Sequence, residues 1–190
     1  MARPRKFNED DVVQMAMMAF WQCGYEATTM KTLSGATGVD ARGLSNVFGD
    51  KEQLFLRSLK HYHEMYQAGL AHIFQIPSLE AVETFFGQLA DDNVPADDPV
   101  HNGCLMVNTV IELGKSSEAI HQSVENYRNM FIEHFRSSLR ASNISNPEEK
   151  AELLLGMLWG ALTQIRLSGS KSTAKPMALQ ILEILRAWRR

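Results

Sequence analysis

The sequence has little cysteine, proline and aromatic content, and it has no excess of positive charge. Two cysteines in 190 residues are too few for a disulfide framework, and six prolines with 8% aromatic residues exclude collagen-like and low-complexity classes. The net charge of −3 excludes a chain that is basic along its whole length, but it allows a basic segment on an acidic body.

Long hydrophobic runs are also missing. The most apolar window, residues 153–167, contains Gln164 and Arg166 and is shorter than the roughly 20 residues that a membrane helix needs. The first six residues are polar and no apolar stretch follows them, which is unlike a secretory signal. We therefore expect a soluble, cytoplasmic protein with no membrane segment.

What the sequence does contain is helical periodicity over nearly its whole length. Hydrophobic residues make up 45% of the chain and charged residues 22%, the usual balance of a globular protein with a core of its own. Apolar residues recur at spacings of three and four, and no convincing strand or hairpin pattern interrupts them. The sequence therefore predicts an all-α fold, with a small N-terminal three-helix domain and a larger C-terminal helical bundle.

Capping residues and glycines predict where the helices begin and end. Asn8 and Gly24 bound the first helix, and Asp50 with Gln53 forms a capping box for a long fourth helix that runs toward Pro77. Later helices are expected to begin near Ser78, Gly103, Ser117, Asn146 and Thr173. A loop is expected at 91–102 and a break at 168–172.

Residues 28–55 carry the most specific pattern. Two helices of about two turns are joined by Thr37-Gly38-Val39, where Gly38 supplies the positive φ of a tight turn and Val39 can pack between the helices. The second helix is expected to present its polar residues outward, namely Arg42, Ser45 and Asn46, with Leu44, Val47 and Phe48 facing in. Arg and Asn can each contact a base edge through two hydrogen bonds. We favour a DNA-binding helix-turn-helix over an ordinary packed helical corner.

The same region resembles a known family. The segments Gly-Tyr-Glu-Ala-Thr-Thr-Met at 24–30 and Gly-Asp-Lys-Glu-Gln-Leu-Phe at 49–55, with Gly38-Val39, Leu44 and Phe48, are similar to the N-terminal domain of tetracycline-repressor-type (TetR) regulators. The match is close over residues 7–60. The rest of the chain is similar only in being helical and of the right length.

The resemblance implies a function and a domain organisation. Most members are dimeric repressors, not enzymes, that bind a palindromic double-stranded DNA operator and leave it when the C-terminal helices take up a small-molecule effector. It implies a basic arm at 1–6, a DNA-binding domain at 7–50, and an effector-binding and dimerisation domain at 51–190. No cofactor and no metal are implied.

The DNA contacts that the resemblance implies fall on three segments. The recognition helix is about 41–47 and includes Ala41, Arg42, Gly43, Ser45 and Asn46. Thr28, Thr29 and Lys51 stand at the family's phosphate positions. Many members have Tyr where this chain has Ser45 and a small residue where it has Arg42, so Arg42 is a candidate to compensate by contacting a base or a phosphate.

The first six residues add three positive charges: Arg3, Arg5 and Lys6. Beside a DNA-binding module, such an arm is expected to lie along phosphates or to enter the minor groove. The alternative is an ordinary solvated terminus.

The C-terminal helices lack a catalytic motif, and a mainly apolar ligand pocket is expected there. Its candidate ligand-binding residues are Met65, Tyr66, Phe86, Cys104, Asn108, Tyr127, Phe131 and Trp159, with Phe85 and Met106 as further lining. The polar groups expected to orient a ligand are Asn108, Glu112, Gln164 and Arg166. The same apolar residues at helical spacing are also typical of a plain core.

The two cysteines carry different expectations. Cys104 follows Gly103 at a helix start, where the helix dipole favours a thiolate and electrophile sensing, although a buried structural thiol is the favoured interpretation. Cys23 is expected in the core stripe of the first helix. His61 and His63 lie two residues apart and face different sides of one helix, which is poor metal-ligand geometry.

Gly156 and Gly160 lie four residues apart in a helix that is apolar nearly all round. Such a helix must be buried on more than one side, so it is expected to form a homodimer interface with the last helix. The residues expected there from the last helix are Leu179, Leu182, Leu185 and Trp188. Two other classes remain as alternatives: a small helical thiol-dependent enzyme that uses Cys104 with a histidine, and a helical binding protein without DNA affinity.

Overall fold

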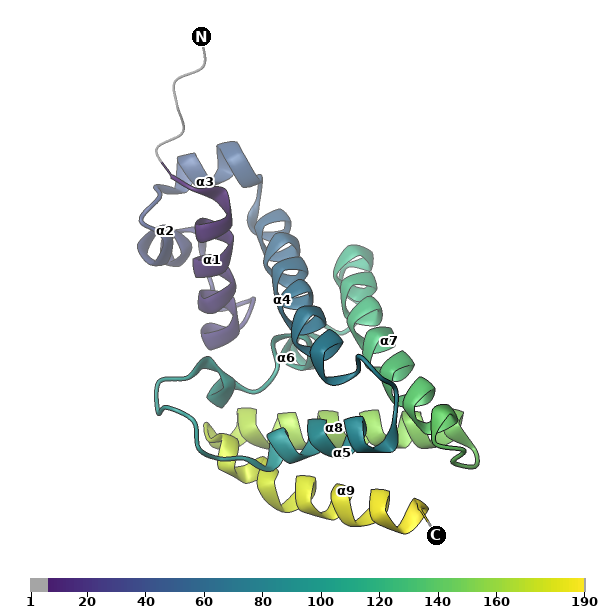
Figure 1. The fold of residues 1–190 in the computed structure, drawn as a ribbon. Helices are drawn as coiled ribbons and strands as arrows, with labels where there is room; N and C mark the ends of the chain where they lie inside the picture. The colour runs from purple at the N-terminus through teal and green to yellow at the C-terminus, as the bar shows by residue number, and fades with distance from the viewer. Residues whose placement is uncertain (1–6, 190) are drawn as a thin grey trace.

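The computed structural model describes residues 7–189, so the predicted basic arm with Arg3, Arg5 and Lys6 lies outside the described residues. Helices dominate the described part, which contains no strand, and the all-α prediction is confirmed (Figure 1). The helices are α1 (Glu9–Cys23), α2 (Met30–Thr37), α3 (Ala41–Phe48), α4 (Lys51–Ile73), α5 (Leu79–Ala90), η1 (Pro99–Asn102), α6 (Leu105–Leu113), α7 (Glu118–Ala141), α8 (Pro147–Ser168), η2 (Lys171–Ala174) and α9 (Lys175–Trp188).

Local signals account for most helix starts. The side chain of Asn8 accepts a hydrogen bond from the backbone N–H of Asp10 and so caps α1, and the Asp50–Gln53 capping box of α4 is present as predicted. Helix α8 begins after Asn146 with Pro147 in its first turn, as predicted, but the backbone of Asn146 is left-handed and its side chain makes no capping bond. A capping side chain needs an extended backbone to reach the helix N–H groups.

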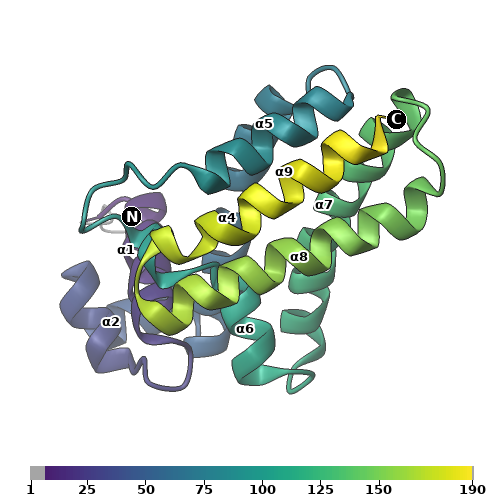
Figure 2. The same cartoon turned by 90° about the horizontal axis from the view of Figure 1, so that it is seen from below.

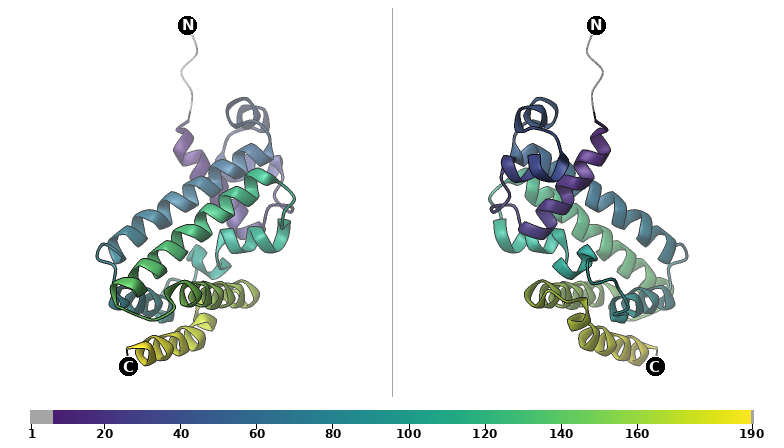
Figure 3. Two further views of the ribbon diagram at one scale, coloured as in Figure 1. Left: turned by 90° about the vertical axis from the view of Figure 1, so that its right-hand side faces the viewer. Right: turned by 90° about the vertical axis from the view of Figure 1, so that its left-hand side faces the viewer.

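The first three helices form a compact unit at one end of the molecule (Figure 1). The long helix α4 packs against α1 in this unit and then continues into the rest of the chain, where it lies beside α7 (Figure 3). One helix is therefore shared between the helix-turn-helix unit and the C-terminal helices.

At the other end, α5, α9 and α8 lie side by side (Figure 2). Helix α7 packs along α8, and the short α6 contacts α1, α4, α7 and α8. None of the helices within residues 7–189 combines the length and the apolar character needed to cross a bilayer.

The core is continuous across both parts. One cluster of buried apolar residues extends from Val12 in α1 to Leu185 in α9. The boundary that we place between residues 50 and 51 remains a prediction, because the same core lies on both sides of it.

The expectation that Cys23 is a core residue is wrong, because its side chain is exposed. The buried residues in the last turn of α1 are Phe20 and Trp21, and the Trp21 ring lies edge-on to Tyr62 with centroids 5.1 Å apart. Two residues correspond to about 200° around a helix, so burying Trp21 turns Cys23 toward solvent.

The turn between α2 and α3 gives a matched pair of glycine substitutions. Gly38 has φ +69°, which costs an L-residue about 1–2 kcal/mol, so Gly38→Ala should lower the free energy of unfolding by about that amount. Gly35 lies inside α2 with open space where a Cβ would stand, so Gly35→Ala should raise stability by about 0.5–1 kcal/mol. Urea unfolding of the two variants measures the change in the free energy of unfolding, which should be negative for Gly38→Ala and positive for Gly35→Ala. Equal changes would contradict the assigned turn geometry.

Candidate DNA-binding interface and effector domain

The turn of the helix-turn-helix is built from three neighbouring residues. Gly38 takes the left-handed conformation and its N–H donates to the carbonyl of Ser34, which ends α2. Val39 follows and is only 9% exposed, so it packs between the helices as predicted. Asp40 then begins α3, because its Oδ1 accepts the N–H of Gly43 at 2.8 Å. These contacts fix where α3 stands relative to α2.

Helix α3 separates its polar and apolar residues. Arg42, Ser45 and Asn46 are exposed, as is Ala41, while Leu44 and Phe48 are buried and Val47 is half-buried. The predicted outward face is therefore present on the described surface. Gly43 has a packing role, since a Cβ there would stand 3.0 Å from Cγ1 of Val39.

The prediction that the Thr28 side chain contacts phosphate is wrong. Thr28 is fully buried, and its hydroxyl donates to the carbonyl of Gly24 at 2.6 Å. The next residue, Thr29, is exposed and caps α2, with its Oγ1 accepting the N–H of Thr32 at 3.1 Å. Its phosphate contact remains a prediction.

Lys51 connects the start of α4 to the loop between α1 and α2. Its ammonium donates to the carbonyl of Tyr25 at 3.2 Å and lies 4.1 Å from the centroid of the Tyr25 ring. An ammonium has three donor hydrogens, so these contacts leave capacity for a phosphate. Lys51 thus holds the loop, and its phosphate contact stays a prediction.

Two side chains from the C-terminal helices hold this loop and the last turn of α1 that precedes it. The carboxylate of Glu112 in α6 accepts the backbone N–H groups of Tyr25 and Glu26 at 2.9 and 2.8 Å. The guanidinium of Arg166 in α8 donates to the carbonyls of Trp21 and Gln22 at 3.4 and 3.2 Å. We call these contacts the loop clamp. Glu112 and Arg166 also line a small pocket of about 220 Å³ with Asn108, and their role in orienting a ligand stays a prediction.

Trp21 makes a further contact between the two parts. Its indole N–H donates to the carbonyl of Gly103 at 3.1 Å, in a buried position just before α6. A Cβ at Gly103 would come within 2.8 Å of the carbonyl oxygen of Leu162, so only glycine allows α8 to lie this close. The end of α1 is thereby tied to the start of α6.

The predicted ligand-binding residues do not surround one cavity. Met65, Tyr66 and Phe85 line a groove of about 400 Å³ between α4 and α5, together with Gly69, Leu70, His72, Ile73 and Gln88. Phe86, Tyr127 and Phe131 are packed in the core, Trp159 and Asn108 are half-buried elsewhere, and Gln164 is exposed. Asn108 donates to the carbonyl of Asn102 at 2.9 Å.

The favoured interpretation of Cys104 as a buried thiol agrees with the structure, and the alternative of a thiolate at the helix start does not. Cys104 is 2% exposed, and burial raises the pKa of its thiol. The loss of solvation raises the thiol pKa by more than the helix dipole lowers it, so the thiol stays protonated at neutral pH. Its Sγ lies 3.7 Å from the hydroxyl of Tyr127. The ring of Tyr62 lies 5.7 Å from that of Tyr127, and no sequence motif marks Tyr62 as a functional residue.

Helices α8 and α9 carry exposed apolar side chains. Leu153, Leu167 and Leu179 are 50%, 81% and 46% exposed. A Cβ at Gly156 would meet nothing within 4 Å, whereas one at Gly160 would touch Met177 of α9 in the same chain. Leu185 is a correction, because it is fully buried inside the chain and has no surface to offer a partner.

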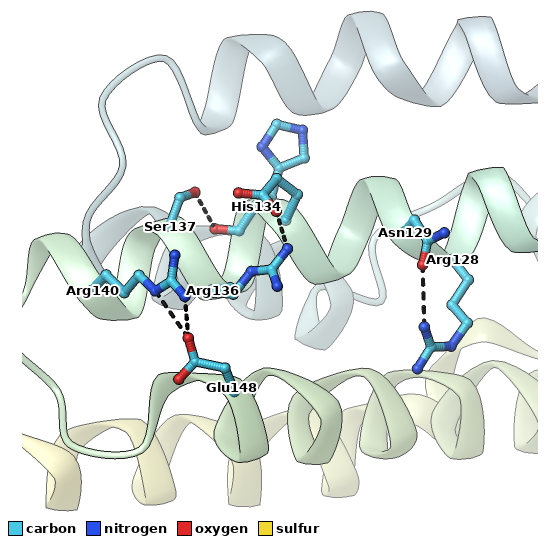
Figure 4. Close-up of polar contacts among 8 residues, drawn as sticks. Arg128, Asn129, His134, Arg136, Ser137, Arg140 and Glu148 are labelled. Atoms are coloured by element: carbon cyan, nitrogen blue, oxygen red, sulfur yellow. Dashed lines mark hydrogen bonds and ion pairs between the residues drawn. The ribbon is translucent and has the colours of Figure 1, made fainter.

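Ion pairs join α8 to α7. Arg140 of α7 pairs with Glu148 of α8 (Figure 4). The guanidinium of Arg128 in α7 donates to the side chain of Asn129 and, at 2.7 Å, to the carboxylate of Glu152 in α8. The orientation of α8 is thus set by α7, which leaves its Gly156 side uncovered.

Comparison with known proteins identifies the N-terminal part. Residues 12–57 match the family described as bacterial regulatory proteins of the tetR family. The chain is 35% identical over 126 residues to the HTH-type transcriptional repressor ComR of Escherichia coli, covering 65% of this chain and 59% of that protein. It is 28% identical over 114 residues to an uncharacterised HTH-type regulator, YezE of Bacillus subtilis, covering 59% and 58%. The matched stretch therefore spans less than two thirds of either relative.

A solved structure extends the likeness to the whole fold. The TetR-family regulator CifR, in a cysteine-substituted form complexed with a 26-base-pair double-strand operator, superimposes with a TM-score of 0.79. The two chains are 25% identical, and the alignment covers 96% of this chain and 98% of that one.

The loop clamp can be tested by amide exchange. Glu112→Ala removes the acceptor of two N–H groups, so the amides of Tyr25 and Glu26 should exchange roughly fivefold faster, the effect of losing one ordinary hydrogen bond. Glu112→Gln keeps one acceptor oxygen and should show a smaller effect. Glu125→Ala on α7 removes a carboxylate that takes no part in the clamp and is the matched control. Unchanged exchange in Glu112→Ala would contradict the clamp.

Proposed function

We propose that this chain, a member of the TetR family of transcriptional regulators, is a dimeric repressor that leaves its operator when a small molecule binds. The observation that carries the proposal is the exposed face of α3, where Arg42, Ser45 and Asn46 project from a capped and packed helix. Arg and Asn can read base edges in the major groove, and the relative CifR is complexed with operator DNA.

Dimerisation would place two such faces on one operator. Two recognition helices match successive major grooves when they lie about 34–36 Å apart. The exposed apolar side of α8 and α9, with Leu153 and Leu179 around the open Gly156, supports a homodimer formed through these helices. The partners proposed are therefore a palindromic operator, a second copy of the chain and a small-molecule effector, with the cytoplasm as the site of action.

The route from effector to DNA follows the contacts between the two parts. Helix α4 joins the helix-turn-helix unit to α5 and α7, and the loop clamp ties the same unit to α6 and α8. A ligand that shifts α4 or α6 would change the spacing of the two recognition helices. The coupling free energy of such a mechanism is typically about 1–3 kcal/mol.

The thiol-enzyme alternative has no support at Cys104. The thiol is buried with a raised pKa, and its side-chain contact is to Tyr127 rather than to a histidine. A nucleophilic cysteine needs a base or a lowered pKa. A gel shift with the promoter beside the protein's own gene, with and without candidate metabolites, separates a regulator from a helical protein without DNA affinity.

Removing single side chains from α3 should weaken operator binding. Arg42→Ala and Asn46→Ala should each reduce specific affinity by roughly 1–3 kcal/mol while non-specific binding changes less, because base contacts carry the specificity. Lys115→Ala, an exposed charge between α6 and α7, controls for the change in net charge. Normal operator affinity in both α3 variants, measured by gel shift, would mean that another surface contacts the bases.

A charged side chain on the open face of α8 should prevent dimerisation. Gly156→Arg meets empty space in the single chain, so the fold should survive, while a buried guanidinium at the interface would lack a partner. Light scattering should report a monomer with unchanged helical content. Gly87→Arg, which also meets nothing within 4 Å, is the control, and a dimeric Gly156→Arg protein would place the interface on another surface.

A further inference from the structure

The hydroxyl of Tyr62 is a polar group without a partner in the middle of the effector domain. Tyr62 is fully buried, and its oxygen makes no hydrogen bond of normal geometry to any residue in the described part of the chain. Leaving a buried hydroxyl unpaired costs stability, whereas a phenylalanine of the same shape would not. Such a group calls for an explanation beyond packing.

Two other phenols and one thiol lie close to the Tyr62 side chain. The Tyr62 ring centroid lies 4.7 Å from that of Tyr66 and 5.7 Å from that of Tyr127, and Tyr66 and Tyr127 are 6.0 Å apart. The thiol of Cys104 donates to the oxygen of Tyr127, so the hydroxyl hydrogen of Tyr127 is not used in that bond. We call Tyr62, Tyr66, Tyr127 and Cys104 the phenol cluster.

The phenol cluster is uncharged at neutral pH. Burial raises the pKa of Tyr66 to about 12, and it also raises the pKa values of Tyr62 and Tyr127 well above their ordinary value. Burial also raises the pKa of the Cys104 thiol. All four groups therefore keep their hydrogens, and Tyr62 and Tyr127 each have one available to donate.

Tyr66 is the member of the phenol cluster that also lines a surface groove. One side of Tyr66 faces the groove of about 400 Å³ between α4 and α5, and its ring packs against Tyr62 on the other. Met65 at the mouth of the groove is 45% exposed, and Gly69 leaves it open because a Cβ there would touch nothing. A turn of the Tyr66 side chain would join the groove to the phenol cluster.

We propose that the phenol cluster binds a small uncharged molecule with a carbonyl-type acceptor oxygen, admitted from the α4–α5 groove when Tyr66 turns aside. The inference rests on the proposed function, in which this domain takes up an effector. A carbonyl oxygen has two lone pairs and can accept from Tyr62 and Tyr127 together. The groove lining contains no lysine or arginine and one histidine, His72, so a carboxylate would lose its solvation without meeting a permanent cation.

Three probes of similar size test the chemistry. Acetophenone carries an acceptor oxygen, ethylbenzene lacks it, and benzoate carries a full charge. Calorimetry on the protein without DNA should show acetophenone binding roughly fivefold to tenfold tighter than ethylbenzene, the effect of one or two neutral hydrogen bonds, and benzoate binding weakest. Equal binding of acetophenone and ethylbenzene, tightest binding of benzoate, or no binding at all would each overturn the proposal.

Removing single hydroxyls tests the assigned donors. Tyr62→Phe and Tyr127→Phe should each reduce the preference for acetophenone over ethylbenzene, while Tyr25→Phe, outside the phenol cluster, should leave it unchanged. Without probe, Tyr62→Phe should be at least as stable as the parent protein, because its hydroxyl has no partner to lose. A clear loss of stability, or an unchanged preference, would contradict the role given to Tyr62.

The route of entry has its own matched pair. Gly69→Leu fills the groove without a clash, so it should slow acetophenone association at least severalfold. Gly87→Leu on α5 also meets nothing within 4 Å but does not line the groove, and it should bind acetophenone normally. Equal association rates in the two variants would overturn this route.

The outcome also separates this inference from the proposed function. A protein that shifts its operator but ignores all three probes contradicts the phenol cluster site alone. A protein that prefers acetophenone through Tyr62 but binds no DNA contradicts the repressor alone.

Discussion

The backbone at the end of α1 has polar groups that must be paired, and their partners determine where the helix-turn-helix unit stands. A helix ends with carbonyls that have no partner inside it, and the loop that follows has free N–H groups. The guanidinium of Arg166 donates to the carbonyls at the end of α1, and the carboxylate of Glu112 accepts the N–H groups of the loop. Lys51 donates a further hydrogen bond to a carbonyl of the same loop. Because these side chains come from α8, α6 and α4, the position of α3 follows from the arrangement of the C-terminal helices.

Features that depend on neighbours in sequence could be predicted. The Asp50–Gln53 box, the left-handed Gly38 and the buried Val39 each follow from the conformational needs of a few consecutive residues. The outward face of α3 follows in the same way from helical periodicity. These short-range signals give the all-α class and most helix starts, and they bring Arg42 to the surface.

Features that depend on distant contacts could not be predicted. Glu112 meets the loop after α1 across more than 80 residues, and no local pattern marks that meeting. The helix start at Cys104 suggested a thiolate, but tertiary burial decides its protonation. Thr28 was assigned by position in a motif, while its hydroxyl bonds back to Gly24. Even the unpaired hydroxyl of Tyr62 becomes visible only when the rings around it are in place.

The continuous core has a consequence for exchanging parts between regulators. A chimera that joined residues 7–50 to a foreign helical body would leave the carbonyls of Trp21 and Gln22 and the indole of Trp21 facing whatever side chains that body supplies. The graft would have to carry Glu112, Arg166 and the tight approach at Gly103 with it. The transferable unit is therefore the helix-turn-helix together with the residues of the C-terminal helices that hold it. Those residues are scattered along the chain, so no single cut in the sequence separates the two parts.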